Sequence, residues 1–447
     1  MLGIGITNTE LSKLLKSKGA NVTVCDKKSR DELGTVCDEM ETLGIKLSTG
    51  EKYLDALKTA DIIFRTPGFY YNSPFLLKAR KEGKVVTSEM EIFFEVCPCP
   101  IYAVTGSDGK TTTTSLIAKF LERQGETVHL GGNIGRALLA DIENIKDSDV
   151  AVVELSSFQL ISMRQSPNVA VFTNISPNHL DVHKDMNEYI LAKCNIFMHQ
   201  NAFSTTVLNY DNELTRNLSD MARGKLVYFS RKKTPAYGAY LDKDSFICFA
   251  QNGQAEKLFH ADEICIPGIH NVENYLAAIT AVYPKVNVEN LRKVANTFNG
   301  VEHRIEFTAE HNGVRWYNNS IATTPSRTIA CLNSFDQKMI IIAGGRDKNL
   351  EYEPLAPLLI EKVKTLILMG ETAKIIEKAV RSHKDFNENE MLIINVEDME
   401  QAVKTAYENA KTGDIVALSP SSSSYDKYKN FEERGKHFKS LVKTVLG

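Results

Sequence analysis

One segment of the chain combines glycine, lysine and threonine in an order typical of nucleoside triphosphate binding. Residues 101–112 read IYAVTGSDGKTT, an apolar run that ends in a glycine-containing turn and continues into a Lys-Thr pair. Backbone N–H groups of such a turn cradle phosphates, Lys110 can reach the β- and γ-phosphates, and the Thr111 hydroxyl can bind Mg²⁺. The usual spacing G-x-x-x-x-G-K-[ST] is not met, because Val104 stands at the first glycine. An ordinary glycine turn before a helix therefore remains the alternative. The predicted phosphate loop comprises Gly106, Ser107, Asp108, Gly109, Lys110, Thr111 and Thr112.

Further groups that could do chemistry follow other apolar runs. Glu154 ends the run VAVVE, and a carboxylate at the carboxyl end of a strand beside the loop strand lies where a nucleotide-bound Mg²⁺ would be. His179 follows the next run and could bind a second cation or a phosphate. Arg304, after His303, could clamp phosphate oxygens. The alternatives are a solvated glutamate, an inert loop histidine and a surface ion pair. Lys193 has apolar neighbours at helical spacing, and this pattern alone favours a surface lysine.

The elements that must position these groups alternate between strand and helix, which predicts an α/β protein with parallel sheets. In the first region the strand-like runs are 22–25 and 61–64. We expect a doubly wound sheet there whose first strand is cut short, because Gly3-Ile4-Gly5 should be the turn after that strand. Asn8 stands where a dinucleotide fingerprint would have its third glycine, so an NAD enzyme is not favoured.

The rest of the chain continues the same alternation. Pro98-Cys99-Pro100 separates the first region from the second. The second region has strand-like runs at 101–105, 150–154 and 169–173, mixed strand-rich sequence at 210–265, and helix-like segments at 113–124, 187–199, 270–282 and 288–298. The third region, from about Gly300, has strand-like runs at 339–343, 365–369, 391–394 and 415–418. Ser421–Ser424 can be a flexible turn.

Composition limits the classes of function. The chain has 447 residues, 43% apolar and 24% charged, with a formal net charge of −3, which gives no electrostatic case for binding nucleic acid or a membrane surface. No apolar run approaches the ~20 residues that span a bilayer. The N-terminal sequence does not read as a signal peptide. The eight cysteines are scattered without metal-ligand spacing, so we expect reduced thiols in a cytoplasmic protein.

Taken together, the motifs resemble the Mur ligase family over essentially the whole chain. The short loop TGSDGKTT is that family's own variant of the phosphate loop. The other motifs that carry the resemblance are Gly132-Asn133-Ile134-Gly135, ELSSFQL at 154–160, HNVEN at 270–274 and His303-Arg304. The tail SYDKYKNFEERG at 424–435 resembles the members that add D-glutamate.

The resemblance implies three α/β domains. They are a Rossmann-like N-terminal domain for a UDP-linked substrate (1–92), a central P-loop ATPase domain (93–297) and a C-terminal Rossmann-like domain for the amino acid (298–447). The implied enzyme is an ATP-dependent ligase that adds D-glutamate to UDP-N-acetylmuramoyl-L-alanine through an acyl phosphate. It would act in cytoplasmic peptidoglycan synthesis, and thus in cell-wall biogenesis, cell shape and division, as a monomer with ATP and two Mg²⁺ ions. The alternatives are a Mur- or folylpolyglutamate-type ligase for another amino acid and a non-catalytic ATP-binding descendant.

Roles transfer from the family to matching positions. The catalytic residues would be Lys110, Glu154, His179 and Lys193, and the metal ligands Thr111, Glu154, His179 and a carbamylated Lys193. Further nucleotide contacts would be Asn271, Asn274, Arg304 and Asn319. The UDP-linked substrate would contact Thr7, Asp26, Gly68, Asn133, Ser156 and Gln159, and D-glutamate would contact Thr323, Lys348, Ser424 and Phe431. Asn319 departs from the family's usual Asp, from which we expect weaker ATP binding.

Overall fold

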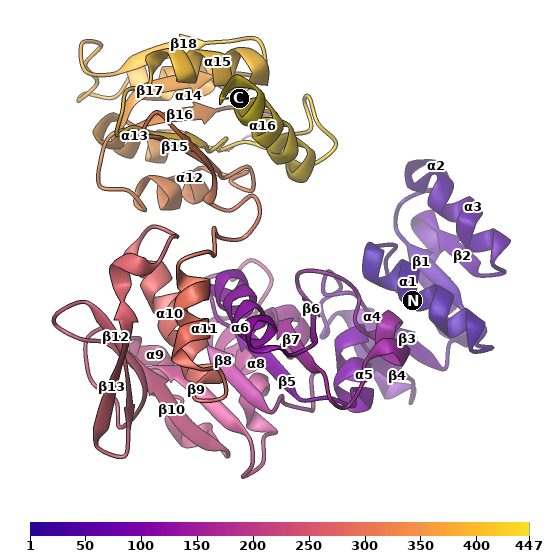
Figure 1. Cartoon of the computed structure of the whole chain (residues 1–447). Coiled ribbons are helices and arrows are strands. Elements are labelled where there is room, and N and C mark those ends of the chain that lie inside the picture. The colour runs from indigo at the N-terminus through magenta and orange to yellow at the C-terminus, as the bar shows by residue number, and fades with distance from the viewer. Residues whose placement is uncertain (349, 447) are drawn as a thin grey trace. The chain divides into compact units, whose positions relative to one another are not determined.

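The computed structural model describes residues 1–348 and 350–446, apart from the side chains of Ile6, Thr7, Val445 and Leu446, and it divides into two compact units (Figure 1). Unit 1 comprises Met1–Glu263 and Glu273–Val294, and unit 2 comprises Ile264–Val272 and Ala295–Gly447. Both units contain parallel sheets with helices between successive strands, which confirms the predicted α/β class. Among the described residues, no helix is long and apolar enough to cross a bilayer.

The N-terminal part of unit 1 contains two pairs of parallel strands that the start of the chain joins. The pairs are β1 (Thr23–Asp26) with β2 (Lys46–Thr49), and β3 (Ile62–Phe64) with β4 (Val85–Thr87). Leu2 forms parallel bridges to Cys25 and to Arg65, so it takes the place of a very short middle strand. The surrounding helices are α1 (Ile6–Ser17), α2 (Arg30–Leu33), α3 (Thr35–Thr42), α4 (Pro74–Lys81) and α5 (Glu89–Val96), with the 3₁₀ helix η1 (Gly50–Thr59).

The centre of unit 1 is an all-parallel sheet in the order β10-β9-β8-β5-β7-β6. The residues of β5 and β7 are buried on both faces, as continuous apolar runs predict. The helix expected at 113–124 begins three residues earlier, at Lys110, because Gly109 takes a left-handed conformation that starts it. The strands are β5 (Ile101–Thr105), β6 (Val128–Gly132), β7 (Val150–Glu154), β8 (Val169–Phe172), β9 (Thr205–Asn209) and β10 (Lys225–Phe229).

The remaining elements of this region pack around that sheet or form an antiparallel one. The antiparallel sheet, which accounts for the strand-rich sequence expected at 210–265, has the order β11-β12-β13. Its strands are Tyr237–Leu241, Phe246–Gln251 and Gln254–His260. The helices are α6 (Lys110–Gln124), α7 (Ser157–Leu160), α8 (Met186–Met198), α9 (Glu213–Arg216), α10 (Ile269–Val282) and α11 (Val288–Ala295), with the 3₁₀ helices η2 (Leu139–Asn144), η3 (Ser219–Met221) and η4 (Ala261–Glu263).

Unit 2 is a six-stranded sheet in the order β14-β15-β19-β16-β17-β18, with β14 antiparallel to β15 and the rest parallel. Apolar side chains form two clusters, and Trp316, the single tryptophan of the sequence, is fully buried in one of them beside Phe438. The strands are β14 (Glu306–His311), β15 (Val314–Asn318), β16 (Met339–Ala343), β17 (Val363–Leu368), β18 (Leu392–Asn395) and β19 (Ile415–Leu418). The helices are α12 (Pro325–Leu332), α13 (Ala356–Lys362), α14 (Ala373–Arg381), α15 (Met399–Asn409) and α16 (Phe431–Leu446), with the 3₁₀ helix η5 (Glu353–Leu355).

Candidate active site

The predicted phosphate loop joins β5 to α6 at the carboxyl edge of the central sheet. Gly109 has φ +78°, and a Cβ there would overlap the amide oxygen of Asn274, so the turn accepts glycine and little else. Helix α6 follows at once and directs its first backbone N–H groups toward the loop, the arrangement that binds anions. Thr113 Oγ1 donates to the same Asn274 oxygen at 3.3 Å. Asn274, a predicted nucleotide contact, thus lies against the start of α6.

The segment that follows β8 braces this loop. The Ser107 N–H donates to the carbonyl of Asn174 and the Asp108 N–H to its side-chain oxygen, both at 2.9 Å. Thr173 Oγ1 donates to the Asp108 carbonyl at 2.6 Å. The loop is therefore fixed on its far side before any ligand binds, which lowers the cost of ordering it around phosphates.

Two lysine amines converge on the carbonyls of the loop. Lys110 Nζ donates to the Ser107 carbonyl at 2.9 Å and to the Gly106 carbonyl at 3.1 Å. Lys193 Nζ, from α8, donates to the Gly106 carbonyl at 2.8 Å. Lys193 is 2% exposed, so the pattern-based alternative of a surface lysine is wrong. Burial, and next the Lys110 charge, lower the pKa of Lys193 well below that of an ordinary lysine, which favours the neutral, nucleophilic amine.

Glu154 is a buried carboxylate with one oxygen left over. The side chain is 1% exposed, which excludes the solvated strand-end alternative. Asn133 Nδ2 donates to Oε1 at 2.7 Å, whereas buried Oε2 has no hydrogen-bond partner among the described residues. An unsatisfied buried carboxylate oxygen is costly, and a hard cation would satisfy it. Glu154 therefore fits the role of a Mg²⁺ ligand. Gly132, the residue before Asn133, has φ +96°, and a Cβ there would overlap the Glu154 carbonyl.

His179 lies in the segment after β8, with φ +56° and an exposed side chain. Its ring packs against Phe158 at 5.0 Å between centroids. Desolvation, followed by the charges of Lys193 and Lys110, lowers the pKa of His179, which favours the neutral imidazole that binds metals. Among the described residues, no three His, Cys, Asp or Glu side chains form a ready-made metal cluster. Mg²⁺ commonly has one or two carboxylates with substrate phosphates as its ligands, and the residues present fit that pattern.

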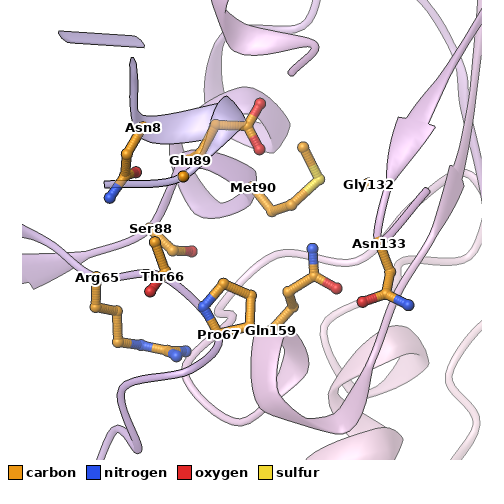
Figure 2. Close-up of a pocket in the computed structure, with 11 residues that line it drawn as sticks. Asn8, Arg65, Thr66, Pro67, Ser88, Glu89, Met90, Gly132, Asn133 and Gln159 are labelled. Atoms are coloured by element: carbon orange, nitrogen blue, oxygen red, sulfur yellow. The ribbon is translucent and has the colours of Figure 1, made fainter. Parts of the chain in front are cut away.

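A cavity of about 280 Å³ lies between the N-terminal part of unit 1 and its central sheet (Figure 2). Two predicted substrate residues, Asn133 and Gln159, line it. Gln159 Oε1 accepts from both the backbone and the hydroxyl of Ser156, each at 2.9 Å, so Ser156 fixes the orientation of its side chain. The lining is Gly5, Asn8, Arg65, Thr66, Pro67, Ser88, Glu89, Met90, Gly132, Asn133 and Gln159.

Gly68, Asp26 and Thr7 are also predicted to contact the UDP-linked substrate. Gly68 follows Pro67 directly but does not itself line the cavity. Asp26 does not line it either, and its carboxylate accepts from the backbone N–H groups of Ile4, at 2.7 Å, and Lys28, at 2.9 Å. It thus holds the turn that leads into α1. The side chain of Thr7 lies outside the described residues.

Sequence reasoning missed two charged side chains of the cavity lining. Arg65, at the end of β3, is 1% exposed. Glu89, in the first turn of α5, accepts from the Leu139 N–H at 2.8 Å, and burial raises its pKa to about 7. Neither residue belongs to a recognisable motif. The one signal available was the position of Arg65 directly before Thr66-Pro67-Gly68, a turn that follows a strand.

Several residues predicted to contact the nucleotide or D-glutamate lie at separate places in unit 2. The amide of Asn319 is used internally: Nδ2 donates to Ser419 Oγ at 3.1 Å and Oδ1 accepts from the Ile305 N–H at 3.3 Å. Asn271, in the first turn of α10, donates through Nδ2 to the carbonyl of Pro267 at 2.6 Å. Arg304 forms a backbone bridge with Val301, and Thr323 is half-buried after β15.

The other residues predicted to contact D-glutamate lie in or near a buried loop of serines. Ser421–Ser424 are at most 2% exposed, so the flexible-turn alternative is wrong. Arg434 donates to the carbonyls of Ser422 and Ser423, each at 3.1 Å, and holds the loop in place. Lys348 Nζ lies 5.4 Å from the ring centroid of Tyr425, the residue that directly follows Ser424. Phe431, at the start of α16, accepts from the Ser320 hydroxyl through its carbonyl at 2.8 Å.

Comparison with known families identifies the class of protein. Residues 104–282 match the Mur ligase middle domain, and residues 303–422 match the Mur ligase, glutamate ligase domain. The chain belongs to the Mur ligase family. Full-length relatives are more specific: proteins named UDP-N-acetylmuramoylalanine--D-glutamate ligase from Acetivibrio thermocellus and Ruminiclostridium cellulolyticum are 53% and 46% identical. Each alignment covers 100% of this chain and 96% of the relative.

Solved structures of other Mur ligases share the fold. The UDP-N-acetylmuramate-alanine ligase MurC from Thermotoga maritima has a TM-score of 0.60 at 19% identity, covering 99% of this chain and 98% of that one. A pseudomurein peptide ligase type C from Methanothermus fervidus has a TM-score of 0.55 at 21% identity, covering 99% and 98%. At these identities the likeness concerns the fold alone.

Proposed function

We propose that the chain is an ATP-dependent ligase that joins D-glutamate to UDP-N-acetylmuramoyl-L-alanine in the synthesis of peptidoglycan precursors. The observation that carries the proposal is the phosphate loop flanked by Lys110, Lys193 and the half-satisfied carboxylate of Glu154. This arrangement suits transfer of a phosphoryl group to an anionic acceptor. The names of the full-length relatives support the choice of D-glutamate as the amino acid.

In the proposed reaction an oxygen of the substrate carboxylate attacks the γ-phosphorus of ATP, and the bond to ADP breaks. The amine of D-glutamate then attacks the carbonyl carbon of this acyl phosphate, loses a proton, and phosphate leaves. Backbone N–H groups of the loop and Lys110 would hold the phosphates in line and stabilise the charge that spreads over the transferred group. Bound Mg²⁺, held by Thr111, Glu154 and His179, would neutralise charge on both reacting anions.

A carbamate on Lys193 is part of the proposal. The lysine is buried, and its lowered pKa favours the neutral amine that reacts with CO₂. The carbamate is an anion with two oxygens, the ligand type that Mg²⁺ prefers, so it would ligate Mg²⁺ where a lysine amine does not. Two cations would then share Glu154, His179 and the modified Lys193.

The remaining assignments follow the same proposal. The cavity beside Asn133 and Gln159 would receive part of the UDP-linked substrate. Asn271, Asn274, Arg304 and Asn319 would approach the nucleotide, and the surroundings of Thr323, Lys348, Ser424 and Phe431 would receive D-glutamate. The three-domain division at 1–92, 93–297 and 298–447, a monomeric state and a cytoplasmic location stay predictions.

Phosphate release tests the function directly. With ATP and Mg²⁺ present, phosphate should appear when UDP-N-acetylmuramoyl-L-alanine and D-glutamate are both added, and not when either is missing. Product mass must rise by one glutamate residue. Turnover with L-lysine, diaminopimelate or a folate in place of these substrates would indicate another ligase of the superfamily. Binding of ATP without turnover of any acceptor would indicate a non-catalytic descendant.

A further inference from the structure

The segment Arg65–Tyr71, which we call the 65–71 segment, connects the cavity to the phosphate-loop region. It follows β3, and its residues Arg65, Thr66 and Pro67 line the cavity, as Figure 2 shows. Arg65 and Tyr70, near its two ends, bond to the central part of unit 1. A ligand in the cavity would therefore touch a segment that is tied to the site of phosphoryl transfer.

Arg65 makes the first of these ties. Its guanidinium donates to the Phe158 carbonyl at 2.9 Å and to Ser162 Oγ at 2.6 Å. Ser162 in turn donates to Glu91 Oε2 at 2.9 Å, which extends the tie to α5. Both bonds leave from Nη2, whereas buried Nε has no hydrogen-bond partner among the described residues. Because burying a guanidinium is costly, the bonds that it does make hold the backbone of α7 next to the end of β3.

Tyr70 makes the second tie. Its hydroxyl donates to Glu188 Oε1 at 2.5 Å. The other oxygen of Glu188 accepts from the Lys184 N–H at 2.9 Å and lies 3.3 Å from His183 Nδ1. His183 Nε2 lies 2.9 Å from Ser157 Oγ, in α7. Tyr70 thus fixes His183 from the side opposite to Ser157.

Both ties converge on one pair of rings. Phe158 and His183 stack with centroids 5.1 Å apart and planes at 5°. Arg65 holds the backbone of the first ring, and Tyr70, through Glu188, holds the second. The ring of His179 packs edge-on against Phe158 at 5.0 Å. The stack is consequently the support against which the exposed His179 is set.

We propose that Arg65 and Tyr70 are positioning residues that couple occupancy of the cavity by the UDP-linked substrate to the placement of His179 at the nucleotide and Mg²⁺. The inference rests on the proposed function. Binding of the substrate against Thr66 and Pro67 restrains the 65–71 segment, and the Phe158–His183 stack transmits this restraint. Neither residue needs to touch the reacting atoms.

Calorimetric titration with Mg-ADP, without and with saturating UDP-N-acetylmuramoyl-L-alanine, measures this coupling. In the wild type the substrate should raise the affinity for Mg-ADP by about 5–150-fold, the usual range for coupled sites. Tyr70→Phe removes one hydroxyl and should reduce that factor at least threefold, as should Ser162→Ala, which removes an acceptor of Arg65. The control is Tyr407→Phe, which makes the same change at an exposed tyrosine of α15, in unit 2.

If Tyr70 and Ser162 only stabilised the fold, the substitutions would weaken Mg-ADP binding equally with and without the UDP-linked substrate. The ratio of these two affinities would then stay unchanged. An unchanged coupling factor in Tyr70→Phe and Ser162→Ala, or a wild-type factor of one, would overturn the inference. In turnover, Tyr70→Phe should lower kcat several-fold, because His179 is placed less accurately. If the wild type fails to bind that substrate at all, the proposed function fails, which is a separate readout from unchanged coupling.

Discussion

The amine of Lys193 donates to the carbonyl oxygen of Gly106 at 2.8 Å, so a side chain of α8 is held directly by the phosphate loop. In this state the lysine stabilises the loop and offers no ligand to a cation. Reaction of the neutral amine with CO₂ would release a proton and place a carboxylate on the nitrogen, so the side chain would gain two acceptor oxygens. The carbamate would then share the edge of the sheet with Glu154, whose Oε2 lacks a partner among the described residues.

Lys193→Ala should lower kcat by about two to three orders of magnitude, the usual cost of removing a group that stabilises transition-state charge. Added bicarbonate should not restore activity. With ¹³C-labelled bicarbonate, the wild type should show a carbamate resonance that the variant lacks and that grows as pH rises, since the neutral amine is the form that reacts. Lys119→Ala, on the exposed face of α6, is the control. Full activity in Lys193→Ala would refute the carbamate.

Glu154→Gln keeps the shape of the side chain and removes the charge that a cation would balance. Activity should fall by about 10²–10³-fold, and half-saturation with Mg²⁺ should rise. Independently of turnover, Mg²⁺ with a bound nucleotide should raise the Tm of the wild type by several degrees and that of the variant much less, since a ligand stabilises by its affinity for the folded state. Glu122→Gln, an exposed change on α6, should behave as wild type. Equal Mg²⁺ stabilisation in Glu154→Gln would exclude the residue as a ligand.

Glu89 should make unit 1 sensitive to pH. Burial raises its pKa from 4.5 to about 7, so between these values the folded chain holds a proton that the unfolded chain has released. The free energy of unfolding must therefore fall as pH rises through this window. Glu89→Gln removes this titration. Its free energy of unfolding should exceed that of the wild type by roughly 3 kcal/mol near pH 8 and by little below pH 4.5.

Calorimetric unfolding of both proteins across this range measures the difference. Glu95→Gln, an exposed change on the same helix, provides the control and should track the wild type at every pH. A constant difference between Glu89→Gln and the wild type would show that Glu89 does not titrate in this window.

Asn319→Asp should destabilise unit 2. The Ser419 hydroxyl gives its own proton to Thr328 at 3.0 Å, so it can only accept from residue 319. A carboxylate would bring two acceptors together, at a cost of about 1–3 kcal/mol. Hydrogen exchange of β15 and β19 should accelerate accordingly. Adding Ser419→Ala should recover part of the loss, whereas unchanged exchange in Asn319→Asp would show that the amide is not needed there.

The parts of the site that could be predicted are those in which chemistry and chain order coincide. Thr105–Thr112 combine strand, turn and helix signals within one short segment, and Glu154 ends an apolar run, so a parallel sheet brings both to one edge. Lys193 could not be read from its pattern, because a lysine among apolar residues at helical spacing indicates snorkelling. The resemblance to the Mur ligase family predicts a role for Lys193, and the structure shows that its side chain is buried.

Arg65 and Glu89 could not be predicted as residues of the site from the sequence. Each acquires its importance from a tertiary contact: Arg65 from the Phe158 carbonyl, and Glu89 from the Leu139 N–H. No local spacing encodes a partner that lies dozens of residues away. The flexible-turn interpretation of Ser421–Ser424 was wrong for the same reason. Composition alone suggests a mobile turn, whereas the buried guanidinium of Arg434 binds the carbonyls of this segment and orders it.

Trp316 gives unit 2 a built-in optical label. It is the chain's single tryptophan, and it is enclosed in the core beside Phe438. Light that excites tryptophan selectively will report on unit 2 and leave unit 1 dark, whereas far-ultraviolet circular dichroism records both. Divergence of the two signals in a denaturant titration would reveal that the units unfold in separate steps.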